Sequence, residues 1–374
     1  MTEADIVIIG GGIAGAAAGF ALAPQRRIVL LERESQPGYH STGRSAALFT
    51  EAYGNATIRA LTKASRAFFL GPPSGFAEHP LLTPRGIITI GRADQKDAVE
   101  QGFAEAHRHV KSVRRISPGE ACAQLPVLRR DYVAHAFIEP EAMDIDVHAV
   151  HRGYLRGVTA AGGRIVTDAE VTGLAQNGGW RVATRAGEFT APVVINAAGA
   201  WCDEIANLAG IAPIGLVPKR RTAITFDLPA GQSPAAWPSM IDADEQFYVK
   251  PDAGRILASP ADETPMPPSD VQPDELDIAI LVDRLEQSTT LQVKRIASKW
   301  AGLRSFVFDK TLVAGFDAEA PGFFWLAGQG GYGIQTSPTM ARVAAALIMG
   351  KGLPPDLIDA GVTEAALAPA RCRA

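Results

Sequence analysis

The chain has 374 residues, of which 47% are apolar, so it can bury a large core and exceeds one average domain of about 150 residues. With 36 Lys and Arg against 40 Asp and Glu, its net charge of −4 excludes the basic excess with which dedicated nucleic-acid binders neutralise phosphates. The three cysteines, Cys122, Cys202 and Cys372, lie far apart without a C-x-x-C pair, so neither a disulfide framework nor a zinc site is expected.

The amino terminus predicts mature structure rather than a secretory signal. Acidic Glu3 and Asp5 lead directly into a buried-strand pattern at Ile6–Ile9. The longest apolar runs, such as Val343–Met349, fall far short of the roughly 20 residues that a membrane span needs. We therefore expect a soluble, cytoplasmic protein with no transmembrane segment.

The first elements in chain order form a dinucleotide-binding pattern. The strand Ile6–Ile9 runs into the glycine turn of residues 10–15, and Ala16–Leu22 is compatible with a helix. A second apolar strand, Ile28–Leu31, ends at Glu32. Strand, glycine turn, helix, strand and acid within about 30 residues make up the complete fingerprint, which is far more specific than a lone G-x-G-x-x-G.

Each residue of this fingerprint has a physical role. Gly10 makes the tight turn, Gly12 lets the backbone approach a pyrophosphate, and Gly15 lets the helix pack closely on the strand. Glu32 is placed to accept hydrogen bonds from ribose hydroxyls, and its charge disfavours a 2′-phosphate. The fingerprint alone does not separate NAD from FAD.

Two later segments repeat the theme of a buried strand followed by small residues. Val193–Asn196 leads into Ala197–Trp201, and the strand Phe323–Ala327 leads into the glycine loop Gly328–Thr336 and an alanine-rich helix that extends to Ile348. Between them, the polar, proline-rich stretch Pro260–Pro273 predicts a surface connection.

These segments together resemble the D-amino acid oxidase superfamily of FAD-dependent oxidoreductases, and within it most closely the bacterial D-arginine dehydrogenases. The likeness covers nearly the whole chain, and its second block is more specific than the glycine fingerprint. The segments that carry it are Gly10–Gly15 with Glu32 and Arg33, Gly38–Ala47, Asn196–Trp201, Trp300–Phe306 and Gly328–Thr336.

The resemblance implies FAD bound without a covalent bond. It also implies that the helix after the last glycine loop points at the flavin N1–C2=O edge, where its N-terminus stabilises the charge of the reduced ring. The residues that it assigns to FAD are Gly10, Gly12, Ile13, Ala14, Gly15, Glu32, Arg33, Ser41, Thr42, Gly43, Arg44, Ser45, Ala46, Ala47, Val171, Ala198, Gly199, Trp201, Gly302, Gly330, Gly331, Tyr332, Gly333, Ile334, Gln335 and Thr336.

For the substrate, the resemblance implies a clamp for a carboxylate. A planar guanidinium can grip a carboxylate with two parallel hydrogen bonds, although an arginine chosen blindly is more often a surface residue. The clamp residues are Arg221 and Arg304, with the hydroxyls of Tyr53 and Tyr248; the Gly331 carbonyl and the Gln335 side chain would fix the amine, and Thr50 would hold a water.

The implied reaction is oxidative deamination of D-amino acids to 2-oxo acids and ammonia, with hydride transfer from Cα to flavin N5. Orientation and electrostatics suffice for this step, so we assign no side-chain general base. All seven histidines lie within the first 151 residues, and His148 with His151 indicates a helix face rather than a metal site. No metal is expected.

This sequence departs from D-arginine dehydrogenases at the substrate side-chain pocket, assigned to Leu48, Thr50 and Ile87. Leu48 and Ile87 replace a histidine and the glutamate that pairs with the substrate guanidinium. Because a buried guanidinium without an anionic partner costs several kcal/mol, we predict that uncharged, mainly hydrophobic side chains are preferred over D-arginine.

The predicted fold class is α/β: a Rossmann-like FAD-binding domain of the glutathione reductase type, with a second α+β substrate domain built on an antiparallel or mixed sheet. Residues 1–78, 145–215 and 300–374 are assigned to the FAD-binding domain. Residues 79–144 and 216–299 are assigned to the substrate domain.

Three alternatives stay open. The same fold could oxidise N-methyl amino acids or glycine, or it could oxidise 2-hydroxy acids with the same carboxylate clamp. A binding or regulatory protein without redox chemistry is the third. The electron acceptor is expected to be O₂ or a quinone-type carrier, which the sequence does not distinguish.

Overall fold

The nucleotide-binding half of the molecule is built on a six-stranded sheet. A computed structural model describes residues 2–229 and 231–373. The strand order is β10-β3-β2-β14-β21-β20, parallel throughout except for the last pair. The strands are β2 (Ile6–Ile9), β3 (Ile28–Leu31), β10 (Arg164–Val166), β14 (Val193–Asn196), β20 (Val313–Phe316) and β21 (Phe323–Ala327). Strands β2 and β3 are buried along their whole length, as β-branched and leucine runs between two layers should be.

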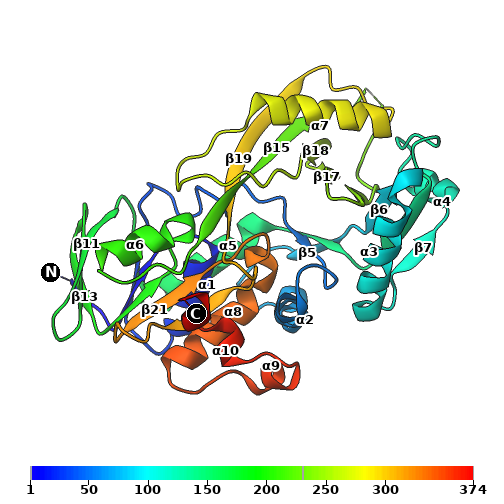
Figure 1. The fold of residues 1–374 in the computed structure, drawn as a ribbon. Helices are drawn as coiled ribbons and strands as arrows, with labels where there is room; N and C mark the ends of the chain where they lie inside the picture. Colours follow the sequence, from blue (N-terminus) through cyan, green and yellow to red (C-terminus); the bar gives the residue numbers. More distant parts are fainter. Residues whose placement is uncertain (1, 230, 374) are drawn as a thin grey trace.

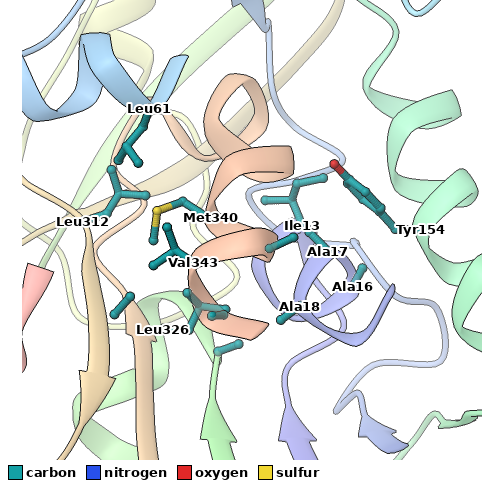
Figure 2. Close-up of a cluster of buried hydrophobic side chains, with 14 of the residues drawn as sticks. Ile13, Ala16, Ala17, Ala18, Leu61, Tyr154, Leu312, Leu326, Met340 and Val343 are labelled. Carbon is teal, nitrogen blue, oxygen red and sulfur yellow. The ribbon is translucent and has the colours of Figure 1, made fainter. Parts of the chain in front are cut away.

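Helices cover one face of this sheet. Figure 2 shows Ala16 and Ala17 of α1 beside Tyr154 of α5, and Met340 and Val343 of α8 in the same buried cluster. The small side chains of α1 let its neighbouring helices approach closely. The covering helices are α1 (Ile13–Leu22), α2 (Ala56–Leu70), α5 (Val147–Ala160) and α8 (Gly333–Ile348).

A second, four-stranded sheet lies against the opposite side of the nucleotide-binding half, near the amino terminus (Figure 1). Its order is β1-β13-β12-β11, and Trp180 and Phe189 pack with Val7 and Trp325 of the central sheet. The elements are β1 (Thr2–Glu3), β11 (Val171–Gln176), β12 (Trp180–Thr184), β13 (Gly187–Ala191) and α6 (Cys202–Leu208).

The other half is a mixed, eight-stranded sheet of order β19-β15-β18-β17-β16-β6-β8-β7, in which only β16 and β6 are parallel neighbours. Its strands are β6 (Ile87–Gly91), β7 (Arg114–Ile116), β8 (His135–Glu139), β15 (Val217–Phe226), β16 (Ser239–Asp242), β17 (Tyr248–Asp252), β18 (Arg255–Ser259) and β19 (Ile296–Phe306). Helix α7 (Glu275–Ser288) lies along its outer side (Figure 1). Ile278, Leu281 and Leu285 of α7 pack in a core cluster with Ile88 and Ile138 of the sheet.

Short elements complete the described chain. Helix α3 (Lys96–His109) packs on the inner side of the eight-stranded sheet through Val99 and Phe137. β4 (Leu48–Phe49), β9 (Met143–Ile145) and β5 (Leu82–Pro84) form a separate three-stranded sheet. The remaining helices are α4 (Pro118–Gln124), α9 (Pro355–Asp359) and α10 (Glu364–Leu367), with 3₁₀ turns at Ala93–Gln95, Gly199–Trp201 and Pro369–Arg373.

The α/β class with a second mixed-sheet unit is confirmed. Residues 300–374 are predicted to be part of the FAD-binding domain, and the first of them, Trp300–Phe306, lie in β19, which pairs with β15 in the eight-stranded sheet. The division into domains stays a prediction.

The contact between α1 and the glycine turn yields a stability prediction. A Cβ on Gly15 would lie 2.0 Å from the Gly10 carbonyl oxygen, which is backbone and cannot move aside. We expect Gly15→Ala to lower the free energy of unfolding by roughly 3 kcal/mol, the upper end of overpacking costs, in urea titrations. The matched control is Gly102→Ala in α3, whose Cβ would meet the Phe137 ring at 3.4 Å and should leave stability unchanged or higher. Equal effects of the two substitutions would contradict this account.

Candidate functional site

Two adjoining cavities lie where the two halves meet. The first, about 540 Å³, opens at the carboxyl ends of β2 and β3, next to the N-terminus of α1, and is lined by Ile9, Leu31 and Gly12 among others. The second, about 90 Å³, is lined by residues of β15, β17 and β19 and by the glycine loop before α8. They adjoin because both are lined by Ile13, Ser41, Thr42, Leu303, Gln329 and Gly330. A site at the carboxyl ends of parallel strands is where α/β folds bind nucleotides.

Most residues predicted to bind the cofactor line these cavities. Those in the first are Gly10, Gly12, Ile13, Ala14, Glu32, Arg33, Ser41, Thr42, Val171, Ala198, Gly199, Trp201 and Gly330. Those only in the second are Arg44, Ser45, Ala46, Gly302, Gly331, Gly333 and Ile334. Among the described residues, Gly15, Gly43, Ala47, Tyr332, Gln335 and Thr336 lie outside both linings; Thr336, for example, donates to the Tyr332 carbonyl within α8.

Two side chains accept hydrogen bonds from backbone N–H groups of the glycine turn. Gly11 N–H donates to Glu32 Oε2 at 3.1 Å, and Ile13 N–H donates to Thr42 Oγ1 at 3.0 Å. Gly10 has φ +107°, and a Cβ there would lie 2.3 Å from the Ala197 carbonyl oxygen, so only glycine fits. Burial raises the pKa of Glu32, and backbone N–H donors oppose that rise. The turn thus presents the α1 N-terminus to the cavity, which favours an anion such as a pyrophosphate.

The donor set of the first cavity fits a dinucleotide. The side-chain nitrogen Nε2 of Gln329 is buried and has no hydrogen-bond partner among residues 2–229 and 231–373, although Gln329 lines both cavities. An unpaired buried donor is costly unless a ligand oxygen meets it. The Arg33 guanidinium lies 4.8 Å from the Trp201 ring, so a flat surface flanks the other end of the cavity. Gln329 was not assigned a role from the sequence, although its place between two glycines of the last loop could have indicated one.

The second cavity holds an uncompensated positive charge. Arg221 donates to the Asp262 carbonyl at 3.0 Å and to Glu263 Oε1 at 3.1 Å. For Arg304, no carboxylate of the described chain lies within 4.0 Å of the guanidinium, whose Nη1 would be 3.0 Å from a Cβ on Gly331. Burial and the nearby Arg304 lower the pKa of Arg221. Two neighbouring guanidiniums, of which only one pairs with a carboxylate, favour the binding of an anion, and a planar carboxylate matches them best.

Other predicted substrate residues lie around this arginine pair. Tyr248 and Gly331 line the second cavity with Arg221 and Arg304. Tyr53 lies behind it, with its ring centroid 5.1 Å from that of Tyr332. Gly333 and Ile334 begin the 16-residue helix α8, so its N-terminus faces the same cavity.

The predicted side-chain pocket gathers around a residue that sequence reasoning missed. Leu48, Thr50 and Ile87 do not line either cavity, but Thr50 Oγ1 donates to Glu139 Oε2 at 2.8 Å, and Glu139 is the register partner of Ile87. Thr50 N–H also donates to Gln335 Oε1 at 3.2 Å. Nothing in the local sequence around Glu139 indicates this role, since only the pairing of β6 with β8 brings it here.

Glu139 is an unusual carboxyl. It is 7% exposed, and burial raises its pKa to about 7, with the nearby acidic Glu51 and Glu141 adding to the rise and the Thr50 hydroxyl opposing it. The cation in this region, Arg66, pairs with Glu51 at 2.6 Å and approaches Glu141 at 3.8 Å, not Glu139.

His151 of α5 has a structural role beside the glycine turn. His151 is buried, and its Nε2 lies 2.8 Å from the Gly11 carbonyl, which it meets as a donor when neutral. Burial lowers the pKa of His151. In the part of the chain that the structure describes, no three His, Cys, Asp or Glu side chains group to hold a metal ion. None of the helices in that part is long and apolar enough to cross a membrane.

Comparison with known proteins places this geometry in a family. The profile of the DAO family, described as FAD dependent oxidoreductase, matches residues 5–347. Glycine oxidase of Geobacillus kaustophilus is 23% identical, with 96% of each chain covered; its crystal structure superposes with a TM-score of 0.80 at 22% identity over 94% of this chain and 96% of that one. FAD-dependent oxidoreductase domain-containing protein 1 of Xenopus laevis is 23% identical over 94% of this chain and 80% of its own. The crystal structure of L-proline dehydrogenase from P. horikoshii has a TM-score of 0.78 at 21% identity, covering 97% and 99%.

The unpaired guanidinium gives the first prediction for this site. We expect Arg304→Met to leave the thermal midpoint of the ligand-free holoprotein unchanged or higher, because it removes a buried charge without a carboxylate partner. Benzoate at 100 times its dissociation constant should stabilise the wild-type protein by about 2.7 kcal/mol and the variant hardly at all. The control, Arg255→Met on the same sheet, removes an exposed arginine paired with Asp227 and should respond to benzoate as the wild type does. An undiminished response in Arg304→Met would contradict a carboxylate site.

The buried carboxyl gives a prediction about pH. Because the pKa of Glu139 is raised from 4.5 to about 7, the unfolded chain releases this proton at lower pH than the folded protein does. Stability is therefore lost as pH rises from about 4.5 to 7, by roughly 3 kcal/mol from this group. We expect the free energy of unfolding of Glu139→Gln, relative to the wild type, to rise by that amount between pH 5 and pH 8 in urea titrations of the holoprotein. Parallel pH profiles would show that the carboxyl is already ionised at pH 5.

Proposed function

Because the chain belongs to the family of FAD dependent oxidoreductases, we propose that it oxidises D-amino acids to 2-oxo acids and ammonia. The observation that carries the amino acid substrate is the Arg304 guanidinium, which lies beside Arg221 in the second cavity without a carboxylate partner among the described residues. A substrate carboxylate would satisfy both guanidiniums at once.

The chain's own residues bind and orient the substrate. Arg304 and Arg221 hold the carboxylate, and the hydroxyl of Tyr248, which lines the same cavity, adds a donor. The Gly331 carbonyl accepts from the amine. Holding both ends of the α-carbon fixes the direction of the Cα–H bond, and such orientation accounts for several kcal/mol of rate enhancement.

FAD, bound without a covalent bond in the first cavity, supplies the acceptor for the two electrons and the hydrogen removed from Cα. The helix α8 begins at the second cavity with Gly333, so its N-terminal N–H groups favour negative charge there. The substrate leaves as an imine, and water converts the imine to the 2-oxo acid and ammonia. No side-chain general base is assigned.

For the substrate side chain, we propose that uncharged groups are preferred over the guanidinium of D-arginine. Leu48 and Ile87 contribute hydrocarbon surface, and the nearby carboxyl of Glu139 is already engaged by Thr50. A cationic side chain would therefore be desolvated without a dedicated counter-charge.

A second candidate is the oxidation of glycine or of N-methyl amino acids. The similarity to glycine oxidase over 96% of this chain favours it, since that protein's name specifies an amino acid without a side chain. The same arginine pair would hold the carboxylate. Oxidation of 2-hydroxy acids would use that clamp as well, with a hydroxyl in place of the amine.

The test is anaerobic mixing of the yellow holoprotein with single substrates while the oxidised-flavin absorbance near about 450 nm is followed. We expect rapid bleaching by D-leucine and D-phenylalanine, slower bleaching by D-arginine, and none by the L-enantiomers. Aerobic turnover with peroxide release would identify O₂ as the acceptor, and its absence would favour a quinone-type carrier.

Other outcomes of this mixing experiment discriminate among the candidates. Bleaching by glycine or N-methylglycine alone would replace the D-amino acid proposal with the second candidate, and bleaching by 2-hydroxy acids alone would replace both. A flavin that only dithionite reduces would contradict all three and indicate a binding protein.

A further inference from the structure

Three side chains on neighbouring strands, two of them polar, form a row across the inner face of the eight-stranded sheet. Ser239 of β16 is the register partner of Ile87 of β6, and Ile87 is the partner of Glu139 of β8. Register partners point to the same face of a sheet, and successive residues point to opposite faces. The residues that alternate with this row, Ile88 and Ile138, pack in the outer core with α7. The row of Ser239, Ile87 and Glu139 therefore faces inward.

The segment Leu48–Thr50 covers this row and connects it to the arginine site. Thr50 Oγ1 donates to Glu139 Oε2 at 2.8 Å, and Thr50 N–H donates to Gln335 Oε1 at 3.2 Å. Gln335 lies in the first turn of α8, directly after Ile334, which lines the second cavity. Hydrogen bonds through Thr50 thus connect Glu139 of this row to Gln335, the sequence neighbour of a residue that lines the second cavity.

The cations beside this row are both engaged by one carboxylate. Lys250 is 6% exposed, and its Nζ lies 2.9 Å from Asp144 Oδ1; Arg85 Nε lies 2.7 Å from Asp144 Oδ2. Asp144 is the register partner of Leu48, so this group of charges lies at the same covering segment. An additional cation would add a further positive charge beside Lys250 and Arg85, which is costly in a buried place.

The row also contains a hydroxyl that lacks a partner. Ser239 is 3% exposed, and its Oγ makes no hydrogen bond within residues 2–229 and 231–373. An unsatisfied buried hydroxyl costs free energy that a ligand recovers if it supplies a matching group, whereas a hydrocarbon recovers nothing. An apolar side chain is therefore not the best complement to this row.

We propose that Glu139, together with Ser239 two strands away in the same row, recognises the end of the substrate side chain and favours a neutral hydroxyl or carboxamide over hydrocarbon of the same size and over a cation. This rests on the proposed oxidation of amino acids and narrows its substrate class. Because burial raises the pKa of Glu139 to about 7, its protonated form persists up to neutral pH, and that form can both donate to and accept from a carboxamide. Glu139 acts as a specificity residue and takes no part in the oxidation itself.

The test compares matched pairs of substrates of whichever enantiomer the enzyme oxidises. The pairs are asparagine with leucine and glutamine with methionine, and the readout is the ratio of kcat/KM within each pair. This ratio cancels any loss of active protein. We expect the better pair to favour the carboxamide at least tenfold in the wild-type holoenzyme. Glu139→Leu should abolish or invert that preference, whereas Glu139→Gln, which keeps an acceptor for Thr50, should retain most of it.

The control variant is Glu141→Gln, whose side chain is 53% exposed and lies outside the row; it should keep the wild-type ratio. A wild-type preference for the hydrocarbon in both pairs, or an unchanged ratio in Glu139→Leu, would overturn the role of Glu139 while leaving the proposed function intact. If no amino acid of either pair or enantiomer is oxidised, and glycine is not oxidised either, the proposed function fails and this inference fails with it.

Discussion

Two half-buried guanidiniums, of which only one pairs with a carboxylate among the described residues, dominate the electrostatics of the second cavity. Arg221 and Arg304 lie on adjacent antiparallel strands, β15 and β19, and of the two only Arg221 pairs with a carboxylate, Glu263, within the described residues. Such an arrangement is unfavourable by itself, because like charges repel and neither is fully solvated. The long pairing of β15 with β19 and the packing of Gly331 against Arg304 hold it in place. Under the proposed function, the carboxylate of the substrate would offset this repulsion, which favours an anion at the site.

Strand β19, which carries Arg304, is also hydrogen-bonded to residues beside the first cavity. Ser41 Oγ donates to the Leu303 carbonyl at 2.6 Å, and Arg44 Nη1 donates to the Ala301 carbonyl at 2.9 Å. In return, Trp300 Nε1 donates to the Arg44 carbonyl at 3.1 Å. The segment that lines the nucleotide cavity is therefore fastened to the strand that carries Arg304. These bonds fix Arg304 relative to the first cavity, as the proposed reaction, which depends on orientation, requires.

Local patterns predicted the elements well, because each depends on residues close together in the chain. The buried run of β2 and the glycine turn were predicted correctly, as was the end of α8 at Ile348, whereas α8 begins at Gly333, inside the segment expected to be a glycine loop. The pairing of β19 with β15 could not be predicted in this way, since the composition of Trp300–Phe306 does not say which of two sheets the strand joins. Glu139 was missed for a related reason. Its burial and its contact with Thr50 depend on the register of β6 with β8, which no local pattern specifies. The pocket predicted from Leu48 and Ile87 as hydrocarbon is bordered by a carboxyl and a hydroxyl.

The central claim is that the carboxylate, held by Arg221 and Arg304, anchors the substrate. The most direct measurement compares the best amino acid substrate with its own carboxamide in anaerobic flavin reduction, with the side chain and amine unchanged. We expect the reduction rate divided by the dissociation constant to fall at least about 100-fold for the amide, because charge-assisted bidentate bonds to two guanidiniums are lost. Equal values for acid and amide would contradict it and would leave the arginine pair without a role in binding.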